Sequence, residues 1–479
     1  MIGKEFRALL PAWLACAAVM VAGVSGFSLL RGFEVAAYFI GTGALGALSI
    51  GHEYTYRTLG ILLSQPIDRR RVLLTKLGVL AVMLVGLLGI AVWTMWLTGE
   101  DKRLVGAAIL WLPLLVSLFV APWLTMASRT SIGGAVFSIA IVGMLVLIGQ
   151  WLGAVRHGYA SEADAFQVAF LWWALAVLSV VGAVMTWRTF LRLETLDGPS
   201  GAAGIRAVAA ASSTTRLTKR NPVWLLMLKE LRLQRLALAV AGVYVIGYLV
   251  ALNVTPASDG DALTVITVFY GGLLAILIGA LASAEERQMG TLDWQMLMPM
   301  AAWQQWAVKA ATVLGLALLL CIALPWLLVS LFPPESMTWL QRSAHFLRTS
   351  TYVLIVVLTI GALYVSSLSG SGLWALLVSL PAFVGGAIFV QTVGSAIERS
   401  VYASLGRPHR GWRFMQGLAS DGLMGVLLAL LIALVLTLAL RNHRSAEGGA
   451  GRAVPQVGLL LASASGGFAL VLVLGALLR

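Results

Sequence analysis

Few side chains in this sequence could carry out covalent chemistry, and none is grouped at a recognisable active-site spacing. The two cysteines, Cys16 and Cys321, both lie inside apolar runs, which argues against a disulfide or a redox pair. The five histidines are scattered, no HExxH pair occurs, and the chain has no G-x-x-x-x-G-K phosphate-binding loop. We therefore expect a protein that is not an enzyme and that holds no metal or cofactor of its own.

The charged residues instead form one pattern that occurs twice. The first copy of E-x4-T-L-x6-P-x9-K consists of Glu53, Thr58, Leu59, Pro66 and Lys76. The second copy, displaced by the same distance along the chain at every position, consists of Glu286, Thr291, Leu292, Pro299 and Lys309. Five identities could arise by chance over many trial offsets, so the location of the copies is the stronger reason to treat them as a repeat.

The elements that carry these residues must be membrane helices. The chain has 479 residues, of which 60% are hydrophobic and 11% charged, whereas a soluble domain has about 45–50% apolar and about 25% charged residues. Long unbroken apolar runs exclude an outer-membrane barrel, whose segments alternate. The net charge of +13 is interpreted as setting membrane orientation, so no nucleic-acid partner is expected. The predicted fold class is an all-α polytopic membrane protein.

Thirteen apolar runs approach or exceed the roughly 20 residues that cross a bilayer. The first six are 11–30, 35–51, 72–97, 104–127, 131–152 and 167–187. The next six are 237–253, 262–283, 306–331, 349–369, 371–392 and 421–440. The last run, 454–478, follows a basic stretch and lies outside this six-plus-six arrangement.

A polar segment at 193–221, rich in glycine, serine and basic residues, predicts a flexible cytoplasmic linker. It separates a first six-span half at 1–192 from a second at 222–441, and residues 442–479 add a basic loop and a C-terminal span. Each half contains one copy of the motif at the end of its second span. A Lys-Glu pair before the first span of each half, Lys4-Glu5 and Lys229-Glu230, extends the correspondence. We therefore predict a tandem repeat of two six-span bundles in parallel orientation, plus one extra span.

The distribution of positive charge predicts a cytoplasmic N-terminus in a bacterial inner membrane. With this orientation, 22 of the 33 Lys and Arg residues fall on the cytoplasmic side. The loop at 393–420 is the exception, because Arg399, Arg407, Arg410 and Arg413 fall together on the outside. Either this loop returns to the interface or a neighbouring span is misplaced.

The segment between the second and third spans predicts a short amphipathic helix over 53–66. Its apolar face follows an i, i+3, i+4, i+7 spacing and consists of Leu59, Leu62, Leu63 and Pro66. Glu53 can pair with Arg57 one turn later, and Asp68 can cap the next helix. Two interpretations stay open: a helix that lies in the membrane interface, and a helix that docks into a cytoplasmic partner.

The two motif lysines, Lys76 and Lys309, are expected one or two turns inside the third span of each half. The favoured interpretation is that their long side chains extend to the cytoplasmic face of the membrane. The alternative is a coupling contact with the docking helix. Apart from these two lysines, the predicted span interiors are almost free of ionisable residues, which disfavours a proton or sodium symporter.

The second copy of the motif resembles the E-x3-G-T-L-x6-P signature of the permease subunits of type-2 ABC exporters. The residues that match it are Glu286, Gly290, Thr291, Leu292 and Pro299. The first copy is similar, but Arg57 stands where the family has glycine, and Met300-Ala301-Ala302 replaces the usual Val-Ser-Arg ending of the second. We therefore expect two docking sites that are not equivalent.

The resemblance implies that the segments at 53–66 and 286–299 are coupling helices, each seated in an ATPase subunit. ATP and Mg would then be bound by two copies of a partner chain. The resemblance implies a permease that exports a hydrophobic or amphipathic substrate and is surrounded by membrane lipid. The sequence leaves two alternatives open: an ion-coupled secondary transporter, and a membrane scaffold or sensor that does not transport.

Overall fold

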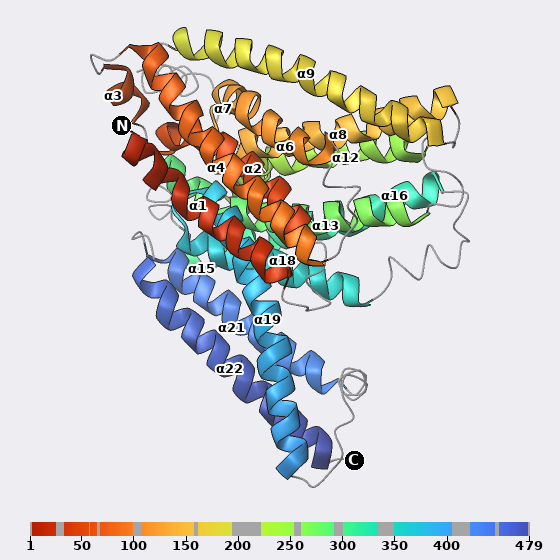
Figure 1. Cartoon of the computed structure of the whole chain (residues 1–479). Coiled ribbons are helices and arrows are strands. Elements are labelled where there is room, and N and C mark those ends of the chain that lie inside the picture. The colour runs from red at the N-terminus through yellow and green to blue at the C-terminus, as the bar shows by residue number, and fades with distance from the viewer. Residues whose placement is uncertain are drawn as a thin grey trace. The chain divides into compact units, whose positions relative to one another are not determined.

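The computed structural model consists of helices (Figure 1), and the residues that it describes contain no strand. The described residues are 2–24, 33–56, 58–64, 68–98, 108–157, 161–193, 222–252, 260–291, 300–333, 349–404, 422–445 and 450–477. A helix satisfies all of its backbone hydrogen bonds within one segment, which is what an apolar chain in a bilayer requires. The predicted all-helical fold is confirmed for this part of the chain.

Twelve of the described helices are long and apolar enough to cross a membrane. The first five are α1 (Ile2–Gly23), α2 (Phe33–Thr55), α4 (Arg69–Thr98), α8 (Ser131–His157) and α9 (Ser161–Leu191). The next four are α12 (Arg235–Leu252), α13 (Gly260–Met289), α15 (Ala302–Leu318) with its continuation α16 (Leu324–Leu331), and α18 (Thr349–Leu368). The last three are α19 (Gly372–Ser404), α21 (Leu423–His443) and α22 (Ala450–Leu477). The chain is thus a multi-pass membrane protein, as predicted.

A bent pair of helices lies where the remaining span was predicted. Helix α6 (Ala108–Phe119) meets α7 (Ala121–Ser128) at an angle of 46°, and the pair gives up to thirteen spans if it crosses as one. Pro122 lies in the first turn of α7, where the missing N–H breaks the helical ladder. The carbonyl of Phe119 at the bend accepts a hydrogen bond of 2.7 Å from the Thr186 hydroxyl of α9. The bend is therefore stabilised from a neighbouring helix.

The chain divides into two compact units. Unit 1 contains Met1–Tyr270 and Pro325–Ala344, and unit 2 contains Gly271–Leu324 and His345–Arg479. The boundary falls within α13 and not in the predicted linker, and α12 packs against α8 of unit 1. The linker at 193–221 lies outside the described residues. The halves predicted at 1–192 and 222–441 stay a prediction.

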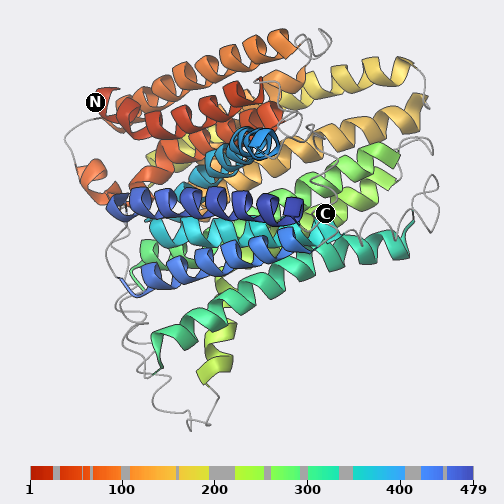
Figure 2. The ribbon, with the colours of Figure 1, turned by 90° about the horizontal axis from the view of Figure 1, so that it is seen from below.

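Unit 1 is built around α2, which packs against α1, α4, α6, α7 and α8. Figures 1 and 2 show α1, α2 and α4 in red and orange, running side by side. Glycines on α2 permit this close approach, because a Cβ added at Gly41 would lie 2.9 Å from the side chain of Cys16 on α1. Cys16 and Cys321 are both free and buried.

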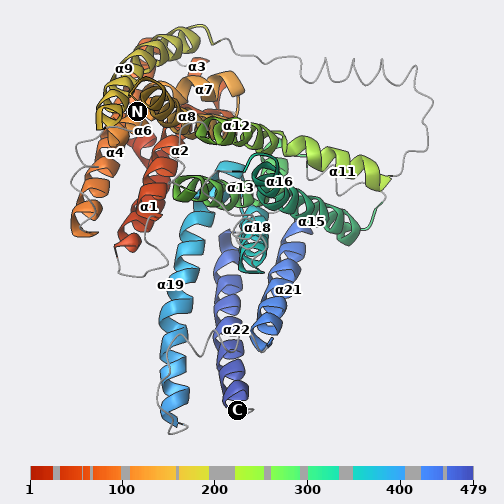
Figure 3. The same ribbon diagram turned by 90° about the vertical axis from the view of Figure 1, so that its right-hand side faces the viewer.

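In unit 2, the long helix α22 lies beside α19 and α21 (Figure 3). A polar contact fixes its N-terminal part: the amides of Asn442 on α21 and Gln456 on α22 exchange hydrogen bonds of 2.8 and 3.1 Å. The Tyr364 hydroxyl and the Ser367 hydroxyl, both on α18, bond to the same two amides at 3.0 and 3.1 Å. This amide pair joins α22 to the bundle, where composition alone predicted only an extra apolar span.

The predicted loop at 393–420 is shorter than expected. Helix α19 continues to Ser404, so Arg399 lies on an exposed helical turn. Arg407, Arg410 and Arg413 lie outside the described residues. The prediction was wrong at this end because the apolar pattern stops at residue 392, whereas the helix continues through polar residues beyond it.

Candidate functional site

The first motif copy forms a buried cluster of charges at the C-terminal end of α2, which we call the first ion-pair cluster (Lys4, Glu5, Glu53 and Lys76). The Lys76 ammonium on α4 donates to Glu5 on α1 at 2.8 Å and to Glu53 on α2 at 3.2 Å. It also donates to the Ser49 carbonyl at 3.3 Å. The Lys4 ammonium nitrogen lies 3.7 Å from a carboxylate oxygen of Glu53, at the exposed edge of the cluster. Three spans are thereby joined by one lysine.

The second motif copy repeats the central ion pair of this arrangement. The Lys309 ammonium on α15 forms an ion pair with Glu286 on α13 and donates to the Ala282 carbonyl at 2.8 Å. Both side chains are fully buried. We call Glu286, Lys309 and the Ala282 carbonyl the second ion-pair cluster. In both copies the lysine donates to a backbone carbonyl 27 positions earlier and to the motif glutamate 23 positions earlier. The geometry therefore recurs together with the sequence motif.

These contacts overturn the favoured expectation for the two lysines. Lys76 is 2% exposed and Lys309 is 0% exposed, so their side chains do not extend to the membrane surface. A buried charge must be paired, and each ammonium pairs with the motif glutamate at the end of the second span. Glu286 is also 0% exposed. The alternative, a coupling contact with the docking helix, stays a prediction.

The threonine of each copy closes the end of its helix. The backbone N–H of Thr58 donates to the Glu53 carbonyl at 3.0 Å, and that of Thr291 donates to the Glu286 carbonyl at 3.0 Å. The Thr58 hydroxyl also donates to the Glu53 carboxylate, whereas the Thr291 hydroxyl donates to the Glu286 carbonyl. Gly290 has a φ of +67°, the left-handed conformation that ends helices and that glycine adopts without strain. The glycine of the signature therefore has a structural reason.

The predicted docking helix over 53–66 is divided in the structure. Glu53 belongs to the end of α2, and a separate short helix, α3 (Leu59–Ser64), follows. Leu62 is buried against Ile50 and Phe190, which anchors α3 to the bundle. The residues at and just before α3 also expose two large apolar side chains, Tyr56 at 56% and Ile61 at 65%. Exposed apolar side chains on an anchored segment fit both open interpretations, a helix in the membrane interface and a surface that binds a partner.

Several predicted docking residues lie outside the described part of the chain. These are Arg57, Pro66, Leu292 and Pro299, so the Glu53–Arg57 pair and both proline stops stay predictions. Leu59 is half-buried at the start of α3. Asp68 caps α4 as predicted, with its carboxylate accepting the Arg70 N–H at 3.1 Å.

An arginine holds the end of the last helix of each predicted half, although from different positions. Arg69 donates to the carbonyls of Leu191 and Leu193 at 3.0 and 2.9 Å, where α9 ends. Arg287 donates to the Asn442 carbonyl at 3.1 Å, where α21 ends. Cations at a helix C-terminus satisfy carbonyls that have no helical partner. Sequence alignment missed this equivalence because the two arginines do not fall at corresponding positions of the repeat.

Close packing between the second and fourth spans also recurs. A Cβ added at Gly279 would lie 2.7 Å from the Ala362 side chain, and one added at Gly46 would lie 2.8 Å from that of Ala121. One turn further along the fourth span, a hydroxyl approaches the next carbonyl of the second span in both halves. The Ser366 hydroxyl donates to the Ala280 carbonyl at 2.8 Å, and the Thr125 hydroxyl lies 3.5 Å from the Ala47 carbonyl. The glycines are related by the same offset as the motif, whereas the offset on the fourth span is larger. These pairs carry no sequence identity beyond glycine and alanine, which is why the sequence did not reveal them.

Within the described residues, no group of three or more His, Cys, Asp or Glu side chains is placed to hold a metal ion.

The residues that sequence reasoning left without a role are Glu5, Tyr56, Ile61, Asn442 and Gln456. Glu5 had a signal, since it precedes the first span in the same Lys-Glu pair as Glu230.

No family model matches this sequence, and neither a curated protein nor a solved structure matches the chain. Function therefore has to be inferred from the geometry of the two ion-pair clusters and of the segments beside them.

Proposed function

We propose that this chain is the membrane permease of an ATP-driven exporter, with two half-permeases fused in one polypeptide. The observation that carries the proposal is the pair of ion-pair clusters, each at the C-terminal end of a second span and each followed by the motif segment. In the first copy, this segment is anchored by Leu62 and exposes Tyr56 and Ile61. ATP and Mg would be bound by separate ATPase subunits, one for each motif segment.

The clusters give such a segment a rigid connection to the bundle. In unit 1, Lys76 ties the end of α2 to both α1 and α4, so a displacement of α3 would move three spans together. In unit 2, Lys309 ties the end of α13 to α15. Buried charge pairs of this kind are poorly tolerant of partial separation, because each partner left alone is a buried unpaired charge. A displacement of a motif segment would therefore move the spans that the lysine joins, without separating the charges of the ion pair.

The tandem repeat belongs to the same proposal. Matching contacts at the ion-pair clusters, at the Gly46 and Gly279 packing sites and at the helix ends held by Arg69 and Arg287 support two related six-span halves. Two parallel halves place both motif segments on one side of the membrane. We place that side in the cytoplasm of a bacterium, together with the N-terminus, on the distribution of Lys and Arg.

The test separates docking from folding by changing an exposed residue. Ile61→Asp adds a charge to a side chain that is 65% exposed, so the fold should survive while an apolar contact is lost. Val223→Asp is the matched control, since Val223 is 43% exposed on a different helix, α11 (Pro222–Leu233), and belongs to neither motif segment. The purified chain is combined with a candidate ATPase subunit, and co-purification and transport-linked ATP hydrolysis are measured in vesicles.

We expect Ile61→Asp to lower co-purification and stimulated hydrolysis about tenfold or more, equivalent to about 1.4 kcal/mol or more. Val223→Asp should behave like the parent. Equal behaviour of both variants in a complex that still works with the ATPase would overturn docking at α3 and leave a helix that lies in the membrane interface.

The buried carboxylates favour a second candidate function, an ion-coupled carrier. Glu53 and Glu286 are 1% and 0% exposed within candidate spans, where such groups often bind protons or cations. The lysine partner of each carboxylate argues for a structural pair instead. Transport in nucleotide-free vesicles that follows a proton or sodium gradient, and that is lost in Glu286→Gln, would support the carrier and contradict the exporter.

A further inference from the structure

An open groove of about 650 Å³ lies between α1 and α4 in unit 1, close to the N-terminal ends of both helices. Its volume is within the range of about 300–1,000 Å³ that is usual for small-molecule sites. It is lined by Ile2, Phe6, Asp68, Arg70, Arg71, Leu74, Thr75, Gly78, Val79 and Val82.

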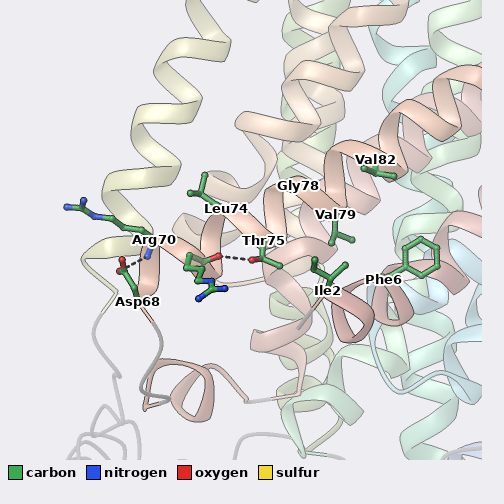
Figure 4. Close-up of a pocket in the computed structure, with 10 residues that line it drawn as sticks. Ile2, Phe6, Asp68, Arg70, Leu74, Thr75, Gly78, Val79 and Val82 are labelled. Carbon is green, nitrogen blue, oxygen red and sulfur yellow. Dashed lines mark hydrogen bonds between the residues drawn. The ribbon is translucent and has the colours of Figure 1, made fainter.

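The two ends of this groove differ in chemistry. Figure 4 shows Asp68 and Arg70 at one end and Val82 and Phe6 at the other. Four apolar side chains that line it are strongly exposed: Ile2 at 66%, Phe6 at 41%, Leu74 at 58% and Val82 at 69%. An exposed apolar surface on two membrane spans is covered by acyl chains. A ligand that fits the whole groove therefore has a polar head and an apolar tail.

The length of the groove matches one leaflet. From Arg70 to Val82 the helix rises by about 18 Å, at about 1.5 Å per residue. Half of a hydrocarbon core of about 30 Å is about 15 Å. An acyl chain that begins beside Arg70 would therefore reach Val82 near the middle of the bilayer.

The charged end selects an anion. Arg70 and Arg71 are both exposed, and neither guanidinium forms an ion pair with any described residue. Asp68 offsets them only in part, because it contributes one negative charge against two positive charges. Its carboxylate accepts the backbone N–H of Arg70 at the start of α4. Arginine donates to phosphate oxygens in a two-pronged geometry, which suits a phosphodiester headgroup.

We propose that this groove binds an anionic phospholipid, with the phosphodiester at Arg70 and Arg71 and one acyl chain along Leu74, Gly78 and Val82. The corresponding positions of the second motif copy hold Trp303 and Gln304 in place of the two arginines, so the site belongs to the first half alone. The lipid would lie against α1 and α4, the two helices that Lys76 joins to α2. The proposal does not depend on the ATPase.

The test uses the full chain in nanodiscs with a phosphatidylglycerol that carries a photoreactive acyl chain. Crosslinks on α1 and α4 are mapped by mass spectrometry, with the matching phosphatidylcholine as the zwitterionic probe. Arg70→Ala/Arg71→Ala removes the headgroup contacts, and Arg188→Ala/Arg192→Ala removes two charges from the end of α9 as a control. Gly78→Leu fills the groove, since a Cβ there meets nothing within 4 Å, and Gly89→Leu is the same change in an equally open place outside it.

We expect Arg70→Ala/Arg71→Ala to weaken phosphatidylglycerol binding about 30-fold, equivalent to about 2 kcal/mol for two surface arginines, while the control pair changes it little. Gly78→Leu should abolish crosslinks between Leu74 and Val82 for this lipid, whereas Gly89→Leu should not. Equal loss in both arginine pairs would show attraction by the overall charge of the protein, and the proposal would fail. Crosslinks that are the same for both lipids and unchanged in Gly78→Leu would show an ordinary lipid belt and would equally overturn it.

Discussion

Lys309 and Glu286 form an ion pair in which neither side chain is exposed to solvent at all. The pair joins α13 to α15 just before the left-handed turn at Gly290. In the first copy, the corresponding Lys76 has two carboxylates, Glu53 and Glu5, and a second lysine at the edge. Both lysines are thus held in buried ion pairs, which predicts what the loss of a carboxylate should cost.

Removing one partner of the second cluster should be strongly destabilising. Glu286→Ala removes the carboxylate that pairs with the buried Lys309 ammonium, and we expect a loss of about 3–5 kcal/mol in the free energy of unfolding. The double variant Glu286→Leu/Lys309→Met removes both charges and should lose much less. Thermal unfolding of the purified chain in detergent measures the difference. A double variant as unstable as the single one would contradict the pairing.

Glu53→Ala should be milder than Glu53→Ala/Glu5→Ala. In the single variant Lys76 keeps its hydrogen bond of 2.8 Å to Glu5, so its charge stays compensated. The double variant removes both carboxylates that Lys76 bonds to, and we expect it to lose about 3–5 kcal/mol in the free energy of unfolding. The single variant should lose about half of that or less, and the same unfolding measurement compares the two. If Glu53→Ala alone is as severe as the double variant, Glu5 is not an effective partner.

The two packing glycines should not tolerate alanine. A Cβ at Gly279 would lie 2.5 Å from the Thr359 carbonyl, and one at Gly46 would collide with the Ser117 carbonyl. We expect Gly46→Ala and Gly279→Ala each to lose about 1–3 kcal/mol of stability through overpacking. Gly242→Ala and Gly315→Ala are controls with open space, and should be neutral or stabilising by up to about 1 kcal/mol. Unfolding temperatures that do not separate the two pairs would refute close packing there.

The amide pair predicts how α22 is held. Asn442→Leu removes both hydrogen bonds that it exchanges with the Gln456 amide, which keeps only the bond from the Tyr364 hydroxyl, and we expect a loss of about 1–3 kcal/mol. Replacing both by leucine should cost less than the single change, because, of the two hydroxyls that bond to these amides, only that of Tyr364 then loses its acceptor. Truncation at Gly448 removes α22 entirely and should lower stability more than it lowers transport activity. Melting temperature and transport rate, measured on the same preparations, test both statements.

The tail gives a test of topology. If the bent pair of α6 and α7 crosses the membrane once, thirteen spans place Arg479 on the side opposite to the N-terminus. A reporter active only in the cytoplasm should be silent after Arg479 and active when inserted at Gly448. Activity at both positions would show that α22 does not span. Silence at Gly448 together with activity after Arg479 would show that the bent pair enters and leaves on one side.

The sequence alone predicted the helical membrane fold, the order of its spans and the importance of the motif residues. Apolar runs of membrane length admit only helices, and the Glu and Lys of each motif are the few charges near span ends. The structure confirms the helices and shows the reason for the turn at Gly290. The docking role of the motif segments stays a prediction.

The tertiary structure decided what the charges do. From the sequence, Lys76 and Lys309 could reach water or a glutamate, because spacing along the chain does not say which faces of two helices meet. Packing places Glu5 on α1 and Glu53 on α2 beside Lys76, although they lie 71 and 23 residues before it in the sequence. The same holds for Asn442 with Gln456. Hydropathy determines which segments enter the membrane, but only side-chain packing determines which polar groups become neighbours.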